Sequence, residues 1–283
     1  MNDPALICKS PAKLNLFLHI TGRRPDGYHE LQTLFQLVDL CDTLEFEVPG
    51  QILPGLLSLR CDDPDVPLDN NLVLRAARRL REVAGLPDAS ASIYLHKRIP
   101  AGAGLGGGSS DAATTLLALN KLWDIHLSQP QLCDIGLELG ADVPLFIQGE
   151  SAWAEGVGEI LEPMELPRHH YLIIWPGVTV STAEIFSQES LTRDSTAIKI
   201  ADFLAGTVRN DCEPIVRRLY PEVDEAFNWL GQYGQARLTG TGSCVFVSFE
   251  NVADAETALA KVPDRFMGFV ATGLDKSPAL PAI

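Results

Sequence analysis

The sequence contains no apolar run long enough to cross a membrane as a helix, which takes about 20 predominantly apolar residues. Its first residues show no basic region followed by a long apolar core, so we expect no secretory signal. Basic residues are in deficit, with 22 Lys and Arg against 37 Asp and Glu and a formal net charge of -15. This balance argues against a protein that wraps nucleic acid, but one basic cleft can still bind a phosphorylated ligand.

Cysteine pairs of the redox or metal-binding type are also missing. The six cysteines form no C-x-x-C motif and have no metal-ligand spacing relative to the histidines. We therefore expect reduced thiols in a cytoplasmic protein. The chain lacks solenoid repeats and low-complexity tracts, and 283 residues with 46% hydrophobic content favour an enzyme of two domains or lobes.

The most informative segment that is present runs from Pro100 to Thr114 and contains five glycines followed by two serines. Glycine has no Cβ atom, so main-chain N–H groups can approach an anion, and glycine adopts the positive φ angles that such a loop needs. Ser109 and Ser110 are predicted to cap a helix over 112–123, whose first-turn N–H groups and dipole would face the anion. The pattern predicts a phosphate-binding loop anchored on a helix.

Two other nucleotide-binding motifs and a plain structural loop are alternatives for this segment. No lysine follows the glycines, which argues against a Walker A loop. Gly102, Gly104 and Gly107 match a dinucleotide-binding fingerprint by letter. However, the preceding segment 92–99 alternates apolar and charged residues, and the acid at the expected distance, Asp124, lies at a helix end. Because a flexible linker seldom leads directly into capping serines and a helix, we favour a phosphate loop of another kind.

The rest of the chain shows a mixed pattern of helices and strands. Leucines alternate with other residues over 14–20, which predicts a half-buried strand with Lys13 and Asn15 on the face opposite the leucines. A second glycine turn, at Gly240 and Gly242, is either a structural hairpin or a second wall of the phosphate site. Further strands are predicted over 31–40, 43–48, 93–99 and 171–175, and further helices over 71–84, 129–139 and 183–186.

A single carboxylate, Asp142, lies in the otherwise apolar segment 140–144. A buried carboxylate costs stability unless it is paired or faces a solvated cleft, which makes Asp142 a candidate functional residue. Asp142 can also begin a short helix as its N-cap, with Pro144 in the first turn. The two interpretations are compatible.

Three ordered segments, 11–16, 100–110 and 238–243, resemble the three motifs of the GHMP kinases, the superfamily of galactokinase and of the homoserine, mevalonate and phosphomevalonate kinases. The resemblance spans nearly the whole chain. It implies an α/β (α+β) two-domain fold, with an ATP-binding N-terminal domain over 1–152, a C-terminal domain over 153–283 and a central cleft.

Segments 11–16, 24–30, 140–144 and 176–178 together resemble more narrowly the GHMP kinases whose acceptor is methylerythritol linked to cytidine diphosphate (CDP). This implies ATP-dependent phosphorylation of a hydroxyl of that acceptor to its 2-phosphate, on the non-mevalonate route to isoprenoid precursors, with Mg²⁺ as cofactor. A GHMP kinase for another small alcohol, such as homoserine or mevalonate, is the alternative. A nucleotide sensor without catalysis is disfavoured because Lys13 and Asp142 are both present. Neither nucleic acid nor a membrane is an expected partner, and the motifs predict no oligomeric state.

The resemblance also assigns roles to the catalytic and ATP-binding residues. Asp142 would accept the hydroxyl proton, and Lys13 would hold Asp142 ionised and stabilise charge on the transferred group. The motifs do not identify the Mg²⁺ ligands. The ATP-binding residues would be Pro100, Ala101, Gly102, Ala103, Gly104, Leu105, Gly106, Gly107, Gly108, Ser109 and Ser110.

At the acceptor end, the resemblance implies a pyrimidine site. Tyr28 and Phe186 would sandwich the cytosine ring, and His29 would hydrogen-bond its edge. Without the resemblance, Tyr28 and Phe186 are more typical of core aromatics. Asn15 and Thr182 would lie close to the same ligand.

Overall fold

The computed structural model of the protein describes residues 4–25, 27–47, 53–204, 206 and 208–280. Within them, ten strands form one mixed sheet, in the order β3-β4-β2-β10-β7-β9-β8 with β1 and β5 also paired to β2 and β6 to β5. The strands are β1 (Leu6–Arg23), β2 (His29–Glu47), β3 (Leu57–Cys61), β4 (Ala91–His96), β5 (Ala152–Glu155), β6 (Ile160–Pro163), β7 (His170–Trp175), β8 (Arg237–Leu238), β9 (Val245–Phe249) and β10 (Met267–Leu274). The helices are α1 (Leu72–Val83), α2 (Gly107–Leu122), α3 (Gln129–Leu139), α4 (Val143–Gln148), α5 (Thr182–Ser187), α6 (Ile200–Leu204), α7 (Glu213–Leu219), α8 (Pro221–Leu230) and α9 (Val252–Leu259).

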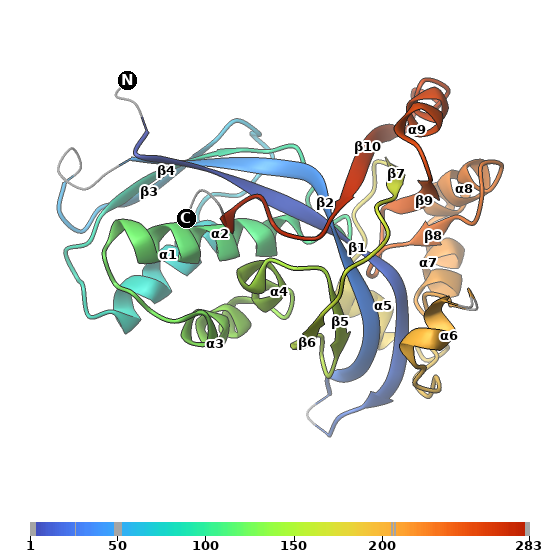
Figure 1. Ribbon diagram of the computed structural model, residues 1–283, viewed down its shortest axis with the longest axis horizontal. Helices are drawn as coiled ribbons and strands as arrows, with labels where there is room; N and C mark the ends of the chain where they lie inside the picture. Colours follow the sequence, from blue (N-terminus) through green and yellow to red (C-terminus); the bar gives the residue numbers. More distant parts are fainter. Residues whose placement is uncertain (1–3, 26, 48–52, 205, 207, 281–283) are drawn as a thin grey trace.

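A long antiparallel hairpin of β1 and β2 runs through the molecule and connects its two ends (Figure 1). Toward its C-terminal end β2 pairs with β4, and further back along the strand it pairs with β10 and β5. Helices α1 to α4 gather against the sheet at one end of the hairpin, while α7 to α9 lie with β7 to β10 at the other (Figure 1). The predicted mixed α/β fold is confirmed. No helix in the described ranges is both long and apolar enough to span a membrane.

The hydrophobic core consists of three clusters. The first packs α1 to α4 against β2, β3 and β4, and the second packs α5, α7 and α8 against β7 and β9. The third includes Leu14, Ala103 and Phe246 and therefore joins β1, the first glycine loop and the C-terminal strands. Because this cluster has members from both ends of the chain, the glycine loop is held by the core on both sides.

Strand β1 was predicted to be half buried, but its central part is buried on both faces. Residues 10–20 are all buried, and Lys13 and Asn15 are 3% and 2% exposed. One face of the strand packs on the core, while the other is covered by the glycine segments and by the elements that border the site. The predicted strands over 31–40 and 43–47 are also one continuous strand, β2, while position 48 lies outside the described residues.

Helix α2 begins at Gly107, five residues before the predicted start. Gly106 is its N-cap residue, with φ of 72°, so a left-handed glycine ends the loop and no side chain caps the helix. The prediction that Ser109 and Ser110 cap this helix was therefore wrong: both lie in its first turn, and the Ser110 hydroxyl accepts a hydrogen bond from Ser10 at 2.8 Å. Other helix predictions are confirmed, α3 with its predicted bounds and α1 within one residue at each end.

A buried charge cluster holds the start of α2 against the sheet. Lys97 Nζ lies 2.5 Å from Asp42 Oδ2 and 3.2 Å from Asp111 Oδ2, and the other Asp42 oxygen accepts two main-chain N–H bonds. Burial raises the pKa of Asp111 to about 7, against the opposing effect of the Lys97 ammonium. One ammonium thus compensates two buried carboxylates below the glycine loop.

Replacing Lys97 with Met should lower the free energy of unfolding by about 3 to 5 kcal/mol, because it removes the cation that compensates the buried Asp42 carboxylate and that opposes protonation of Asp111. Urea denaturation at neutral pH measures this loss. The matched control is Lys9→Met, which removes an exposed lysine of β1 and should change stability by less than about 0.5 kcal/mol. Equal effects of the two variants would contradict the account of the cluster.

Candidate active site

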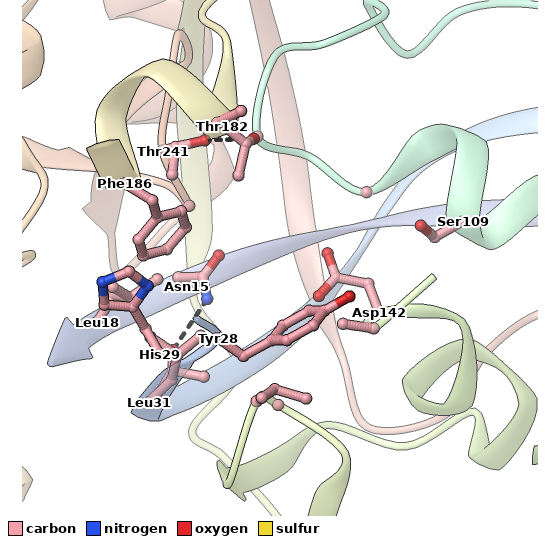
Figure 2. A pocket seen from close by; sticks show the side chains of 18 of the residues that line it. Asn15, Leu18, Tyr28, His29, Leu31, Ser109, Asp142, Thr182, Phe186 and Thr241 are labelled. Atoms are coloured by element: carbon pink, nitrogen blue, oxygen red, sulfur yellow. Dashed lines mark hydrogen bonds between the residues drawn. The ribbon is translucent and has the colours of Figure 1, made fainter. Parts of the chain in front are cut away.

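A cleft of about 710 Å³ opens between the two ends of the molecule. Its walls come from β1, the β1–β2 turn, β2, the first glycine loop with the start of α2, the segment before α4, the β5–β6 turn, helix α5 and the second glycine turn. Figure 2 shows Ser109 and Asp142 toward one end of this cleft and His29 with Phe186 toward the other. The cleft therefore brings together residues from segments that are far apart in the sequence.

Lys13 lies on the floor of the cleft and is held from three sides. Its ammonium donates a hydrogen bond to Asn15 Oδ1 at 2.6 Å and lies 3.5 Å from Asp142 Oδ2. The same nitrogen stands 5.3 Å above the centre of the Phe35 ring, a favourable cation–π distance. The Lys13 side chain is 4% exposed and that of Asp142 is 31% exposed, so a ligand in the cleft can reach the carboxylate directly.

Asp142 occupies the N-cap position of α4, as predicted, with Pro144 in the first turn. Its side chain forms no cap hydrogen bond and instead faces Lys13. A Cβ atom at Gly140 would lie 3.7 Å from Ser109 Oγ, so the Ser109 hydroxyl faces the same segment. The chain thus places one carboxylate and one hydroxyl beside the start of α2.

Asn15 connects Lys13 to the second glycine turn. Its main-chain N–H donates to Thr239 Oγ1 at 3.1 Å, and its side-chain amide donates to Thr33 Oγ1 at 2.9 Å. The Thr239 hydroxyl in turn donates to the Gly104 carbonyl at 3.0 Å. With Asn15 2% exposed, these contacts fix the orientation of its Oδ1 toward the Lys13 ammonium.

The first glycine loop is clamped between β1 and the second glycine turn. Lys13 N–H donates to the Leu105 carbonyl at 2.9 Å, and Cys244 N–H donates to the Ala103 carbonyl at 3.0 Å. Gly104 and Gly106 line the cleft together with Ser109. The side chains of Ala103, Leu105 and Ser110 are buried in the protein, so of the predicted ATP-binding residues these three do not present side chains to the cleft.

Several glycines are required by protein packing as well as by an open cleft. Gly104 has φ of 78°, and a Cβ atom there would lie 2.3 Å from the Thr239 carbonyl oxygen. A Cβ atom at Gly107 would lie 2.9 Å from Ile99 Cγ2. Glycine is therefore needed at Gly104 for the close approach of the two glycine segments, in addition to the access to an anion predicted from the sequence.

The end of the cleft opposite the glycine loop contains a stacked pair of rings that was not predicted. His29 stacks on Phe186, with ring centres 4.8 Å apart and planes 26° from parallel. Tyr28 is 64% exposed, and Figure 2 shows its hydroxyl directed toward Asp142. The Thr182 and Thr241 hydroxyls lie 2.9 Å apart across the top of the cleft. The structure thus brings all five predicted substrate residues to one cleft, while the sandwich of a pyrimidine between Tyr28 and Phe186 stays a prediction.

The cleft offers few ligands for a metal ion of its own. Within the described residues, no group of three or more His, Cys, Asp or Glu side chains is placed to hold one. Mg²⁺ in phosphoryl-transfer sites is usually held by substrate phosphates, waters and one or two protein oxygens. Ser109 and Asp142 beside the start of α2 fit a metal ion that arrives with a nucleotide.

Three features of the site were not predicted from the sequence. Thr33 and Thr239 orient Asn15, and Arg193 donates a hydrogen bond from Nε to His29 Nε2 at 3.1 Å. The Thr-Gly-Thr-Gly run that includes Thr239 carried a signal, since its glycines were singled out. Thr33 and Arg193 carried no signal in the sequence, because each acts through a contact with a residue of another element.

The chain matches two protein-family models. Residues 71–150 match the GHMP kinases N terminal domain, and residues 190–267 match the GHMP kinases C terminal domain. Curated relatives similar over the full length are the 4-diphosphocytidyl-2-C-methyl-D-erythritol kinases of Hahella chejuensis, 50% identical over 99% of this chain and 97% of the relative, and of Pseudomonas aeruginosa, 55% identical over 93% and 92%.

Solved structures show the same likeness. The crystal structure of a 4-(cytidine 5'-diphospho)-2C-methyl-D-erythritol kinase superposes with a TM-score of 0.80 at 34% identity, over 95% of this chain and 99% of that one. A mevalonate kinase superposes with a TM-score of 0.71 over 96% and 100% of the two chains. At 16% identity, this second likeness concerns the fold alone.

Replacing Gly104 with Ala should lower the free energy of unfolding by about 2 kcal/mol or more, because alanine is strained at positive φ and its Cβ would overlap a carbonyl oxygen. Chemical denaturation checks this value. Gly108→Ala is the control: it lies in α2, and its Cβ would meet Leu72 Cδ1 at an ordinary 3.5 Å. We expect stability within about 1 kcal/mol of the parent for Gly108→Ala, and a Gly104→Ala variant as stable as this control would refute the close packing of the two segments.

Proposed function

The chain belongs to the 4-diphosphocytidyl-2-C-methyl-D-erythritol kinase family of the GHMP kinases, and we propose that its cleft transfers the γ-phosphoryl group of ATP to a methylerythritol hydroxyl of this CDP-linked acceptor. One observation carries the proposal for the site: Lys13 and Asp142 face each other at 3.5 Å between the glycine loop and the His29–Phe186 ring pair. A phosphate held at one end of the cleft and an alcohol held at the other would meet at this pair.

The start of α2 is suited to hold the nucleotide phosphates. The first N–H groups of a helix have no acceptor within the helix, and its dipole favours negative charge at this end. Gly104, Gly106 and Ser109 border the cleft at this point. A bound Mg²⁺ would neutralise phosphate charge, and we propose that Ser109 is among its protein ligands.

Asp142 and Lys13 carry the chemistry. The acceptor hydroxyl gives its proton to the Asp142 carboxylate while its oxygen bonds to the γ-phosphorus, and the bond from that phosphorus to the bridging oxygen of ATP breaks to release ADP. Lys13 pairs with the Asp142 carboxylate at 3.5 Å and stabilises negative charge on the transferred group. Asn15 keeps the Lys13 ammonium in place through the 2.6 Å hydrogen bond.

The opposite end of the cleft binds the cytidine part of the acceptor. Phe186 offers an aromatic face held in place by its contact with His29. Tyr28, which is 64% exposed at the cleft mouth, would cover the cytosine ring from the other side. Thr182 borders the same end. A ligand that stacks there can extend its alcohol toward Asp142.

Two wider proposals accompany the activity. We propose domains over 1–152 and 153–283, supported by family-model matches that lie on either side of this boundary. We also propose a cytoplasmic location, supported by six cysteines that are all free thiols.

The substrate is tested by incubating the protein with ATP, Mg²⁺ and one alcohol at a time, followed by ³¹P NMR detection of new phosphomonoesters. The proposal predicts a product from the CDP-linked methylerythritol and none of comparable rate from mevalonate or homoserine. A faster reaction with either uncytidylated alcohol would favour the alternative GHMP kinase activity and reject the proposal.

Asp142→Asn should reduce turnover by about 100-fold or more, because the amide keeps the shape of the side chain but accepts no proton. ATP affinity should change little. Steady-state kinetics and calorimetric ATP binding measure the two effects. Asp134→Asn, an exposed acid on α3, is the control for loss of one negative charge. Near-parental turnover of Asp142→Asn would remove Asp142 from the role of base.

A further inference from the structure

Arg193 lies behind the ring pair and has an unusual set of partners. Its Nε–H donates to His29 Nε2 at 3.1 Å, and its Nη2 donates to the Phe186 carbonyl at 3.0 Å. In the described part of the chain, no carboxylate forms an ion pair with it. The remaining acceptors are main-chain carbonyls, those of Gln188 at 2.8 Å, Leu191 at 3.2 Å and Glu189 at 3.5 Å.

This arrangement determines which His29 nitrogen carries the proton. A guanidinium has only donors and stays protonated in proteins, so the nitrogen that faces it must be an acceptor. His29 Nε2 is therefore unprotonated, and the neutral imidazole carries its proton on Nδ1. Among the described residues Nδ1 has no protein partner, and His29 lines the cleft, so this N–H is left as a donor for a ligand.

The surrounding charges keep His29 in this neutral form. Burial lowers its pKa below the ordinary value, and the cations Arg193 and Arg23 lower it further. These two arginines are the charged groups that act on the ring within the described residues. Protonation of Nε2 would disrupt the Arg193 contact, and both burial and the two arginines oppose it.

A single fixed N–H donor distinguishes two pyrimidines. Cytosine presents an acceptor at N3, whereas uracil presents an N3–H donor at the same place. A donor aimed at this edge forms a hydrogen bond with cytosine and leaves two opposed donors with uracil, and unmatched polar groups in a binding site are a strong source of discrimination.

We propose that Arg193 is a positioning residue that makes the site select cytosine over uracil by fixing the His29 tautomer. The inference rests on the proposed function, because it takes the acceptor to be cytidylated. It goes beyond that function in assigning the choice of base to a residue that does not border the cleft.

The test is calorimetric binding of CDP and UDP at pH 8 and pH 6 to the parent protein and to Arg193→Met. The parent should bind CDP at least about tenfold more tightly than UDP at both pH values, since one hydrogen bond is exchanged for two opposed donors. In Arg193→Met this ratio should fall to within about threefold at pH 8, because the proton is free to move to Nε2. Acidification to pH 6 should restore CDP binding to this variant, because the pKa of His29 rises without Arg193 and the imidazolium again presents an Nδ1–H.

Two further variants separate tautomer control from a structural role. Arg193→Lys keeps one N–H donor near Nε2 and should retain a larger CDP preference than Arg193→Met. Arg218→Met is the control, because Arg218 holds the same loop through Ser190 without contacting His29, and its CDP to UDP ratio should equal that of the parent. Long-range ¹H–¹⁵N NMR of the parent protein should show Nδ1 of His29 protonated, a result that needs no variant to fold.

Three outcomes would overturn the inference. One is a proton on Nε2 in the NMR spectrum. Another is an equal loss of CDP and UDP affinity in Arg193→Met without recovery at pH 6, which would give Arg193 only a structural role. The third is equal binding of CDP and UDP to the parent protein, which leaves a pyrimidine site without base selection. Failure of the parent to bind either nucleotide would instead reject the cytidine site of the proposed function, and the inference with it.

Discussion

Burial of the Lys13 ammonium is the constraint on which the rest of the site depends. The charge of a side chain that is only 4% exposed must be compensated. The partners of the Lys13 ammonium are the side-chain oxygen of Asn15, the Asp142 carboxylate and the Phe35 ring. Asp142 alone among these is both charged and substantially exposed. The interaction that makes the buried lysine tolerable therefore also holds the Asp142 carboxylate at the surface of the cleft, where we propose that it accepts the hydroxyl proton.

The two glycine segments turn this local pair into a site. Gly104 can approach Thr239 closely because it has no side chain, and the Thr239 hydroxyl bonds both Gly104 and the Asn15 main chain. The loop that borders the nucleotide end is thus built against the strand that carries Lys13. A second kind of charge burial supports the same loop from below, where Lys97 compensates two carboxylates. The packed core therefore fixes the positions of the residues that line the cleft.

Local patterns in the sequence were sufficient for several elements and for candidate residues that the structure brings to one cleft, but not for contacts across elements. The positions of α1 and α3 followed from periodicity and caps, and the glycine loop from its composition. The start of α2 was missed because a left-handed glycine, rather than a serine, ends the loop. The full burial of β1 could not be read from alternation, since its second face is covered by segments more than 80 residues away in the chain. The same holds for the His29 partners, Phe186 and Arg193, which follow it by more than 150 residues.

The account is tested most directly by a structure of the protein with a non-hydrolysable ATP analogue and the CDP-linked methylerythritol both bound. We predict the nucleotide phosphates at the start of α2, the cytosine ring against Phe186, and the acceptor hydroxyl between the Asp142 carboxylate and the γ-phosphoryl group, with Lys13 beside both. An acceptor hydroxyl out of hydrogen-bond reach of Asp142, or a cytidine moiety bound at the glycine loop, would contradict it.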